Sequence, residues 1–107
     1  MTDGELMARF EDGTLAPASF RHREHVRLTW LYLGRYGQAE TERRLLSGLR
    51  ELAARAGKPD KFSETLTRAW VGRIADAAAS LPVGHLFPDL LTQRPDVLDA
   101  RAPVQTI

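Results

Sequence analysis

The chain has 107 residues, 43% hydrophobic and 27% charged, a balance typical of one small globular domain and unlike that of disordered chains. It has no cysteine, which excludes disulfides, thiolate-based zinc sites and cysteine catalysis. The net charge of +1 favours neither nucleic acid nor a membrane surface as a partner. No secretory signal is visible and no apolar run approaches the roughly 20 residues that span a bilayer, so we expect a soluble, cytoplasmic protein.

Apolar residues recur at helical spacing along most of the chain. The pattern predicts helices over residues 3–13, 21–36, 39–56 and 60–80, and a shorter fifth helix from Pro88. We place the start of the fourth helix at Asp60 rather than Ser63, because Phe62 continues its apolar stripe. No segment shows the alternating pattern of a strand. We therefore predict an all-α fold, a compact bundle of four to five short helices, with residues 1–95 as a single domain and residues 96–107 as an extended tail.

Two histidines, His22 and His25, lie three residues apart on the apolar side of the second predicted helix. Residues at this spacing are neighbours, about 5–6 Å apart at Cβ. Two imidazoles at that separation can share a divalent metal ion, or one can bind a substrate while the other transfers a proton. Thr29 continues the same row one turn later. A buried polar group without a partner costs on the order of 1–3 kcal/mol, so this row needs partners.

The fourth predicted helix supplies candidate partners. If it packs against the second helix, its polar residues face the histidines across one pocket. We predict His22, His25 and Glu64 as catalytic residues, with His22 and His25 also as metal ligands, because two histidines and a carboxylate match mononuclear metal sites. The predicted ligand-binding residues of this pocket are Thr29, Trp30, Ser63, Thr67 and Trp70.

Each of these residues also has a simpler explanation. Glu64 precedes Arg68 by four residues, the favoured order for a helix ion pair. The two threonines can bond to the carbonyl four residues earlier, and the two tryptophans can be core residues. The histidines can be satisfied by backbone carbonyls or by the two tyrosines, Tyr32 and Tyr36, and their spacing is not the i, i+4 spacing of zincins. His85, in a predicted loop, is expected to be exposed.

Two segments together resemble a known pattern. The stretches FRHREHVRLTWLYLGRYG and GKPDKFSETLTRAW are similar to a family of small, uncharacterised bacterial all-helical proteins, over about residues 5–80. That family has Phe-x-His-x-x-His, an apolar helix with Trp, then Lys-aromatic-His-Glu-Thr and a further Trp. The resemblance implies that the two segments act together, and it implies no reaction. This chain has Ser63 in place of the second motif's histidine, which weakens a metal site. The matching positions are Phe20, His22, His25, Trp30, Lys61, Phe62, Glu64, Thr65 and Trp70.

The residues therefore predict a small pocket protein that binds a small polar ligand or a metal through His22 and His25, with acid/base or metal-assisted chemistry. Whether it is an enzyme stays open. The alternative is a helical interaction or accessory module with structural histidines, which binds a protein partner or forms a homodimer. Nucleic acid is not expected, because the second helix's arginines are better explained as a solvated face. These are Arg21, Arg23, Arg27 and Arg35.

Overall fold

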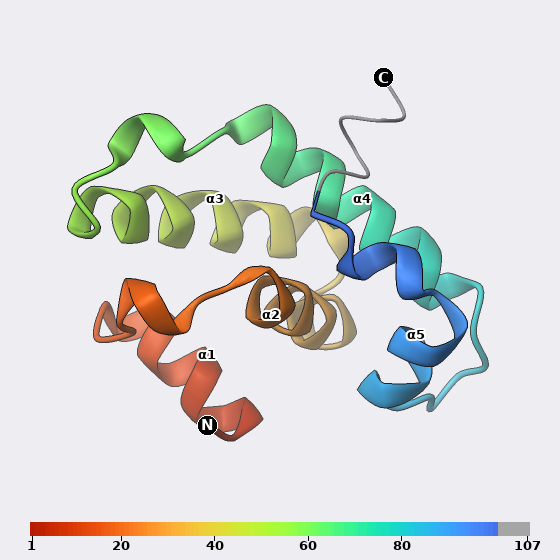
Figure 1. Cartoon of the computed structure of the whole chain (residues 1–107). Coiled ribbons are helices and arrows are strands. Elements are labelled where there is room, and N and C mark those ends of the chain that lie inside the picture. Colours follow the sequence, from red (N-terminus) through yellow and green to blue (C-terminus); the bar gives the residue numbers. More distant parts are fainter. Residues whose placement is uncertain (101–107) are drawn as a thin grey trace.

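The computed structural model describes residues 1–100 of the chain (Figure 1). This part contains five α-helices and three short 3-10 helices. No strand occurs in this part, so the predicted all-α bundle of four to five helices is confirmed. None of these helices combines the length and the apolar character needed to cross a bilayer. The α-helices are α1 (Asp3–Asp12), α2 (His22–Tyr36), α3 (Gln38–Arg55), α4 (Glu64–Ala79) and α5 (Phe87–Gln93). The 3-10 helices are η1 (Pro17–Ser19), η2 (Pro59–Lys61) and η3 (Pro95–Leu98).

Helix α2 is the central element of the fold. Figure 1 shows it nearly end-on, with α1 below it, α3 and α4 above it and α5 to one side. A single residue, Gly37, separates α2 from α3 and has a φ of 81°, a value that favours glycine. This sharp connection makes α3 cross α2 instead of extending it.

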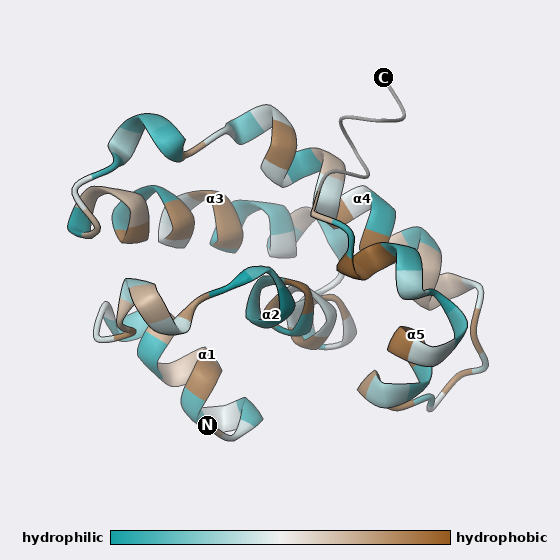
Figure 2. Cartoon of the chain, viewed as in Figure 1, coloured by the Kyte–Doolittle hydropathy of each residue, from teal (hydrophilic) through white to brown (hydrophobic). Residues whose placement is uncertain are grey.

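Two hydrophobic clusters form the core, and both include residues of α2. The first joins α1 to α2, α3 and α4, and the second joins α2 and α4 to α5 and η3. Hydrophobic and hydrophilic residues alternate along each ribbon, as amphipathic helices require (Figure 2). The first cluster contains Leu6, Phe10, Leu15, Leu28, Tyr32, Leu45 and Val71. The second contains Val26, Trp70, Ile74, Ala77, Leu90 and Val97.

The predicted start of the fourth helix was wrong by one turn. Residues Pro59–Lys61 form the separate helix η2, and α4 begins at Glu64. Ser63 is the N-cap: its backbone is extended, and its Oγ accepts a hydrogen bond of 3.2 Å from the amide of Leu66. The apolar side chain of Phe62 suggested an earlier start, but Phe62 is extended and precedes the cap.

The C-terminal segment also differs from the sequence prediction. We expected an extended tail from residue 96, but Pro95–Leu98 forms η3 and the side chain of Val97 is fully buried in the second cluster. Asp96 accepts hydrogen bonds from Arg94 and Arg73, which fix η3 against α4. The packed domain therefore includes η3. The rest of the predicted tail, residues 101–107, lies outside the described residues.

Candidate functional site

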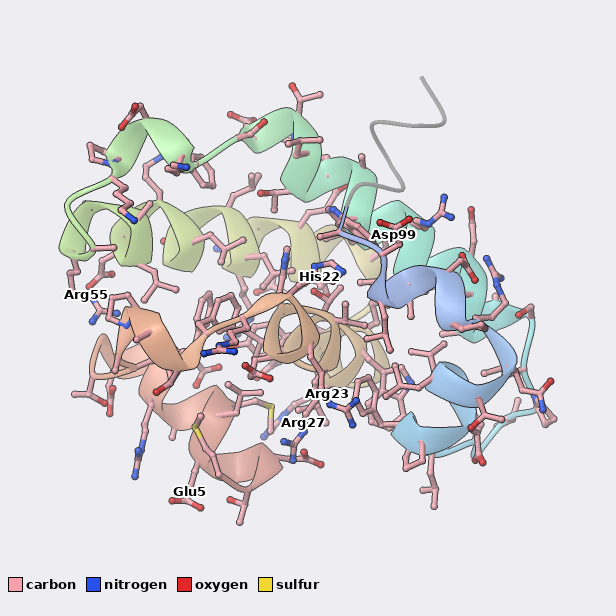
Figure 3. All side chains as sticks on the ribbon, in the orientation of Figure 1. Glu5, His22, Arg23, Arg27, Arg55 and Asp99 are labelled. Atoms are coloured by element: carbon pink, nitrogen blue, oxygen red, sulfur yellow. The ribbon has the colours of Figure 1, made fainter. Side chains whose placement is uncertain are left out.

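Helices α2 and α4 pack against each other at the two histidines. The ring of His22 lies edge-on to Trp70 of α4, with centroids 4.5 Å apart. The rings of His22 and His25 are 6.2 Å apart, and His25 is 5.8 Å from the ring of Phe20. Figure 3 shows His22 on the side of α2 that faces α3 and α4. The two segments singled out in the sequence therefore meet in space.

His22 has a partner within the fold. Its Nε2 lies 2.9 Å from the main-chain oxygen of Val97. A carbonyl oxygen only accepts, so Nε2 carries the proton and donates it. The simpler prediction, that a backbone carbonyl is the hydrogen-bond partner of this histidine, is therefore confirmed for His22. A metal ion can bind Nε2 only if this hydrogen bond breaks.

His25 is in a different situation. Its Nε2 is buried and has no hydrogen-bond partner among residues 1–100. Burial, and the nearby His22 to a smaller extent, lower the pKa of His25 from 6.5 to about 4. The ring is therefore neutral at pH 7. A buried polar nitrogen without a partner in the protein is the kind of group that a ligand or an ordered water satisfies.

The side chains of the two threonines bond within their own helices. The hydroxyl of Thr29 donates to the carbonyl of His25, and that of Thr67 donates to the carbonyl of Ser63, each at 2.8 Å. The simpler explanation of both threonines is confirmed. Thr29 is fully buried, whereas Thr67 and Ser63 border a cavity next to His25.

We call this space the His25 cavity; it is open to solvent on one side and is bordered by η1, the start of α2, the second half of α3, η2 and the start of α4. Its volume is about 390 Å³. Most of the lining is apolar, and includes Phe20, Leu49, Leu52, Ala53, Phe62 and Trp70. The polar side chains on its walls are those of His25, Lys61, Ser63 and Thr67.

Four predicted site residues do not line this cavity: His22, Thr29, Trp30 and Glu64. Glu64 is exposed and accepts a hydrogen bond of 2.7 Å from Arg68, which lowers the pKa of its carboxyl. The indole N–H of Trp30 donates to Nε2 of His85 at 2.9 Å, in a second, larger cleft of about 700 Å³. The prediction of one pocket that contains His22, Glu64 and both tryptophans was therefore wrong. The helical periodicity of the sequence correctly predicted which side of each helix faces the core, but it did not predict which residues line the same cavity.

His85 is half-buried rather than exposed, which corrects the sequence prediction. Its Nδ1–H donates to the carbonyl of Pro82 at 2.9 Å, so its Nε2 is free to accept from Trp30. No local pattern marks this contact, because 55 residues separate the two rings along the chain. His85 is not a third imidazole for His22 and His25, since it lines the second cleft.

Within residues 1–100, no cluster of three or more His, Asp or Glu side chains is placed to hold a metal ion. The position that follows Lys61 and Phe62 carries Ser63, which caps α4. The cavity therefore offers His25 without a second free imidazole or a carboxylate.

Sequence reasoning from single residues missed several walls of the cavity. Phe20, Lys61 and Phe62 all line it, although none of them was among the predicted site residues. No family model matches the chain, and the searches of curated proteins and of solved structures returned no match either. The resemblance therefore stays a prediction, and function is argued from the cavity itself.

Proposed function

We propose that the protein binds a small organic molecule in the His25 cavity. The observation that carries this proposal is the buried, unpartnered Nε2 of His25 beside a mostly apolar space. A volume of about 390 Å³ suits a small ligand. The ligand's apolar body packs against the aromatic and aliphatic walls, and one polar group hydrogen-bonds to His25.

Binding, rather than proton transfer, is the activity that we propose first. A general base works best when its pKa is near the working pH. The pKa of His25, lowered to about 4, makes the imidazole a weak base at neutral pH. A neutral imidazole is nevertheless a good hydrogen-bonding group, because one ring nitrogen donates and the other accepts.

His22 has a positioning role in this proposal. It packs against Trp70, a wall of the cavity, and its hydrogen bond to Val97 fixes the ring. Ser63 and Thr67 line the cavity, and their hydroxyl oxygens retain acceptor lone pairs, since a hydroxyl oxygen can accept as well as donate. A bound metal and a cytoplasmic location stay predictions.

The experiment uses Trp70 as its own reporter. Trp30→Phe removes the tryptophan outside the cavity, so the remaining fluorescence comes from Trp70. This variant is titrated with small aromatic and aliphatic compounds that carry one polar group. We expect a saturable change in emission for some of them. Adding Ala53→Phe, which fills the cavity from α3, should abolish the change.

The matched control is Ala54→Phe, because Ala54 is exposed on the same helix and does not line the cavity. It should leave the titration unchanged. The proposal fails if no compound saturates the signal, or if Ala53→Phe and Ala54→Phe behave alike.

A second function, self-association as a homodimer, is favoured by one observation. Val83 is fully exposed at the rim of the larger cleft between α2 and α4. Contiguous exposed apolar surface marks contact sites, and the lining of the cleft that Val83 borders is mostly apolar. Sedimentation of the parent protein and of Val83→Glu tests this: a dimer that only the parent forms supports it, and two monomers exclude it.

A further inference from the structure

We propose that the ligand of the His25 cavity is a small carboxylic acid with an apolar body, bound as its anion. This inference rests on the proposed function and specifies the chemical class of the ligand. The carboxylate is the polar group that hydrogen-bonds to His25. Lys61 and the N-terminus of α4 provide a positive electrostatic potential that favours the anion.

The charges around the cavity favour an anion. Lys61 is the lining residue with a permanent charge, and the lining contains no acidic side chain. None of the ion pairs formed within residues 1–100 involves Lys61. Its ammonium group is therefore available, on a flexible stem that can reach a ligand at the cavity mouth.

The nearest acidic side chain along α4 is neutralised by its own partners. Glu64 is paired with Arg68, 2.7 Å away, and a second arginine, Arg50, is 3.9 Å from its carboxylate. A carboxylate ligand near Lys61 therefore meets little repulsion. An amine ligand, by contrast, would find no anionic partner on the cavity wall.

The orientation of α4 adds to the same potential. Ser63, Leu66 and Thr67 line the cavity, and they belong to the first turn of a 16-residue helix. The amide ends of a helix give its N-terminus a partial positive charge. Ser63 caps the amide of Leu66, and its carbonyl accepts from the amide of Thr67, so the cap orders this turn at the cavity.

His25 provides the independent sign of a ligand. Its Nε2 is buried and has no partner among residues 1–100, and the residue lines the cavity. A neutral imidazole N–H that donates to a carboxylate gains a charge-assisted hydrogen bond. One carboxylate can thus accept a hydrogen bond from the unpartnered nitrogen of His25 and also pair with the ammonium group of Lys61. A neutral amide can bond to His25 but forms no ion pair with Lys61.

The test compares ligands that differ only in the polar group. Phenylacetate, 2-phenylacetamide and 2-phenylethylamine form one series, and octanoate, octanamide and octylamine form a second with a linear body. Affinities are measured by calorimetry and by Trp70 emission in the Trp30→Phe variant. We expect at least one acid to bind about tenfold or more tightly than its amide, and the amines to bind weakest.

Variants of the two lysines locate the charge. Lys61→Gln should weaken the acid by about threefold to fivefold, because an exposed ion pair contributes modestly, and should leave the amide unchanged. Lys58→Gln is the matched control: Lys58 is equally exposed, three residues earlier, and does not line the cavity. The acid's advantage should also shrink as ionic strength rises.

The outcomes separate this inference from the proposed function. An amide that binds as tightly as its acid, or an acid preference that Lys61→Gln does not reduce, overturns the carboxylate proposal and leaves small-molecule binding standing. If no member of either series binds, both proposals fall.

Discussion

The Nε2–H of His22 donates to the main-chain oxygen of Val97, 2.9 Å away, and thereby joins the first turn of α2 to η3. The same imidazole packs edge-on against Trp70, a wall of the His25 cavity. His22 therefore has a structural role that needs no ligand, whereas no partner within residues 1–100 accounts for the buried Nε2 of His25.

His22→Ala should loosen η3. The change removes a hydrogen bond to a partly buried carbonyl and the contact with Trp70, so we expect the free energy of unfolding to fall by about 1–2 kcal/mol. Urea denaturation measures this loss. Hydrogen exchange should also become faster at the amide of Val97, which bonds to the carbonyl of Arg94 within η3. Unchanged protection at Val97 would contradict the structural role.

His25 should make stability fall in mild acid. Its pKa is 6.5 in the unfolded chain and about 4 in the folded protein, so the unfolded chain binds the proton first as the pH drops. The stability that the neutral ring provides is complete above about pH 6.5 and is lost between about pH 6.5 and 4, by roughly 3 kcal/mol. Denaturation at several pH values measures the slope.

The control for that slope is His25→Leu, which cannot titrate. Its stability should change less over the same pH range, and the difference between the two curves isolates His25 from the carboxyl groups. At pH 7 the variant should be at least as stable as the parent, because it removes a buried nitrogen that lacks a partner. Parallel curves for the two proteins would refute the buried, neutral ring.

Glu64→Gln should leave ligand affinity unchanged. The carboxylate is exposed, bonds to Arg68 and does not line the His25 cavity. Removing its charge should affect phenylacetate binding far less than Lys61→Gln does, and calorimetry compares the two directly. A large loss of affinity or of activity in Glu64→Gln would restore the predicted catalytic role that this geometry does not favour.

Two helical glycines should respond in opposite ways to alanine. A Cβ on Gly48 would overlap the ring of Phe10, which is buried in the first cluster. We expect Gly48→Ala to cost about 1–3 kcal/mol despite its better helix propensity. On Gly34 a Cβ meets nothing within 4 Å, so Gly34→Ala should stabilise by about 0.5–1 kcal/mol.

Thermal unfolding of the two variants beside the parent provides the measurement. Gly34→Ala serves as the control for Gly48→Ala, since both place the same methyl group in a helix. Equal shifts in the melting temperature would mean that α1 does not pack on α3 through Phe10.

The helices and their inner faces could be predicted because both depend on local periodicity. The set of residues that line the His25 cavity could not be predicted in this way. Trp30 lies eight residues after His22 on one helix, roughly 12 Å along its axis, so a shared face does not place both in one small pocket. The contacts that determine the site join distant segments: 75 residues separate His22 from Val97, and 55 separate Trp30 from His85.

The fourth helix illustrates a different limit. Phe62 fits the apolar stripe as well as Leu66 does, so periodicity alone extends the helix backwards. The hydrogen bond that the Oγ of Ser63 accepts from the amide of Leu66 fixes the start of the helix. This bond is worth about 1 kcal/mol, too small to outweigh the pattern in a sequence-based argument. The later start affects the predicted site. Ser63 becomes the N-cap of α4, and Glu64 lies in the first turn without lining the His25 cavity.

Both ends of the described fold are fastened to α2, only five residues apart. Asp3 forms an ion pair with Arg27, and the carbonyl of Val97 accepts a hydrogen bond from His22. His25 lies between these two attachments. The short stretch of helix that borders the cavity therefore also joins the two ends of the described fold, so a molecule bound in the cavity lies beside the place where both ends are attached.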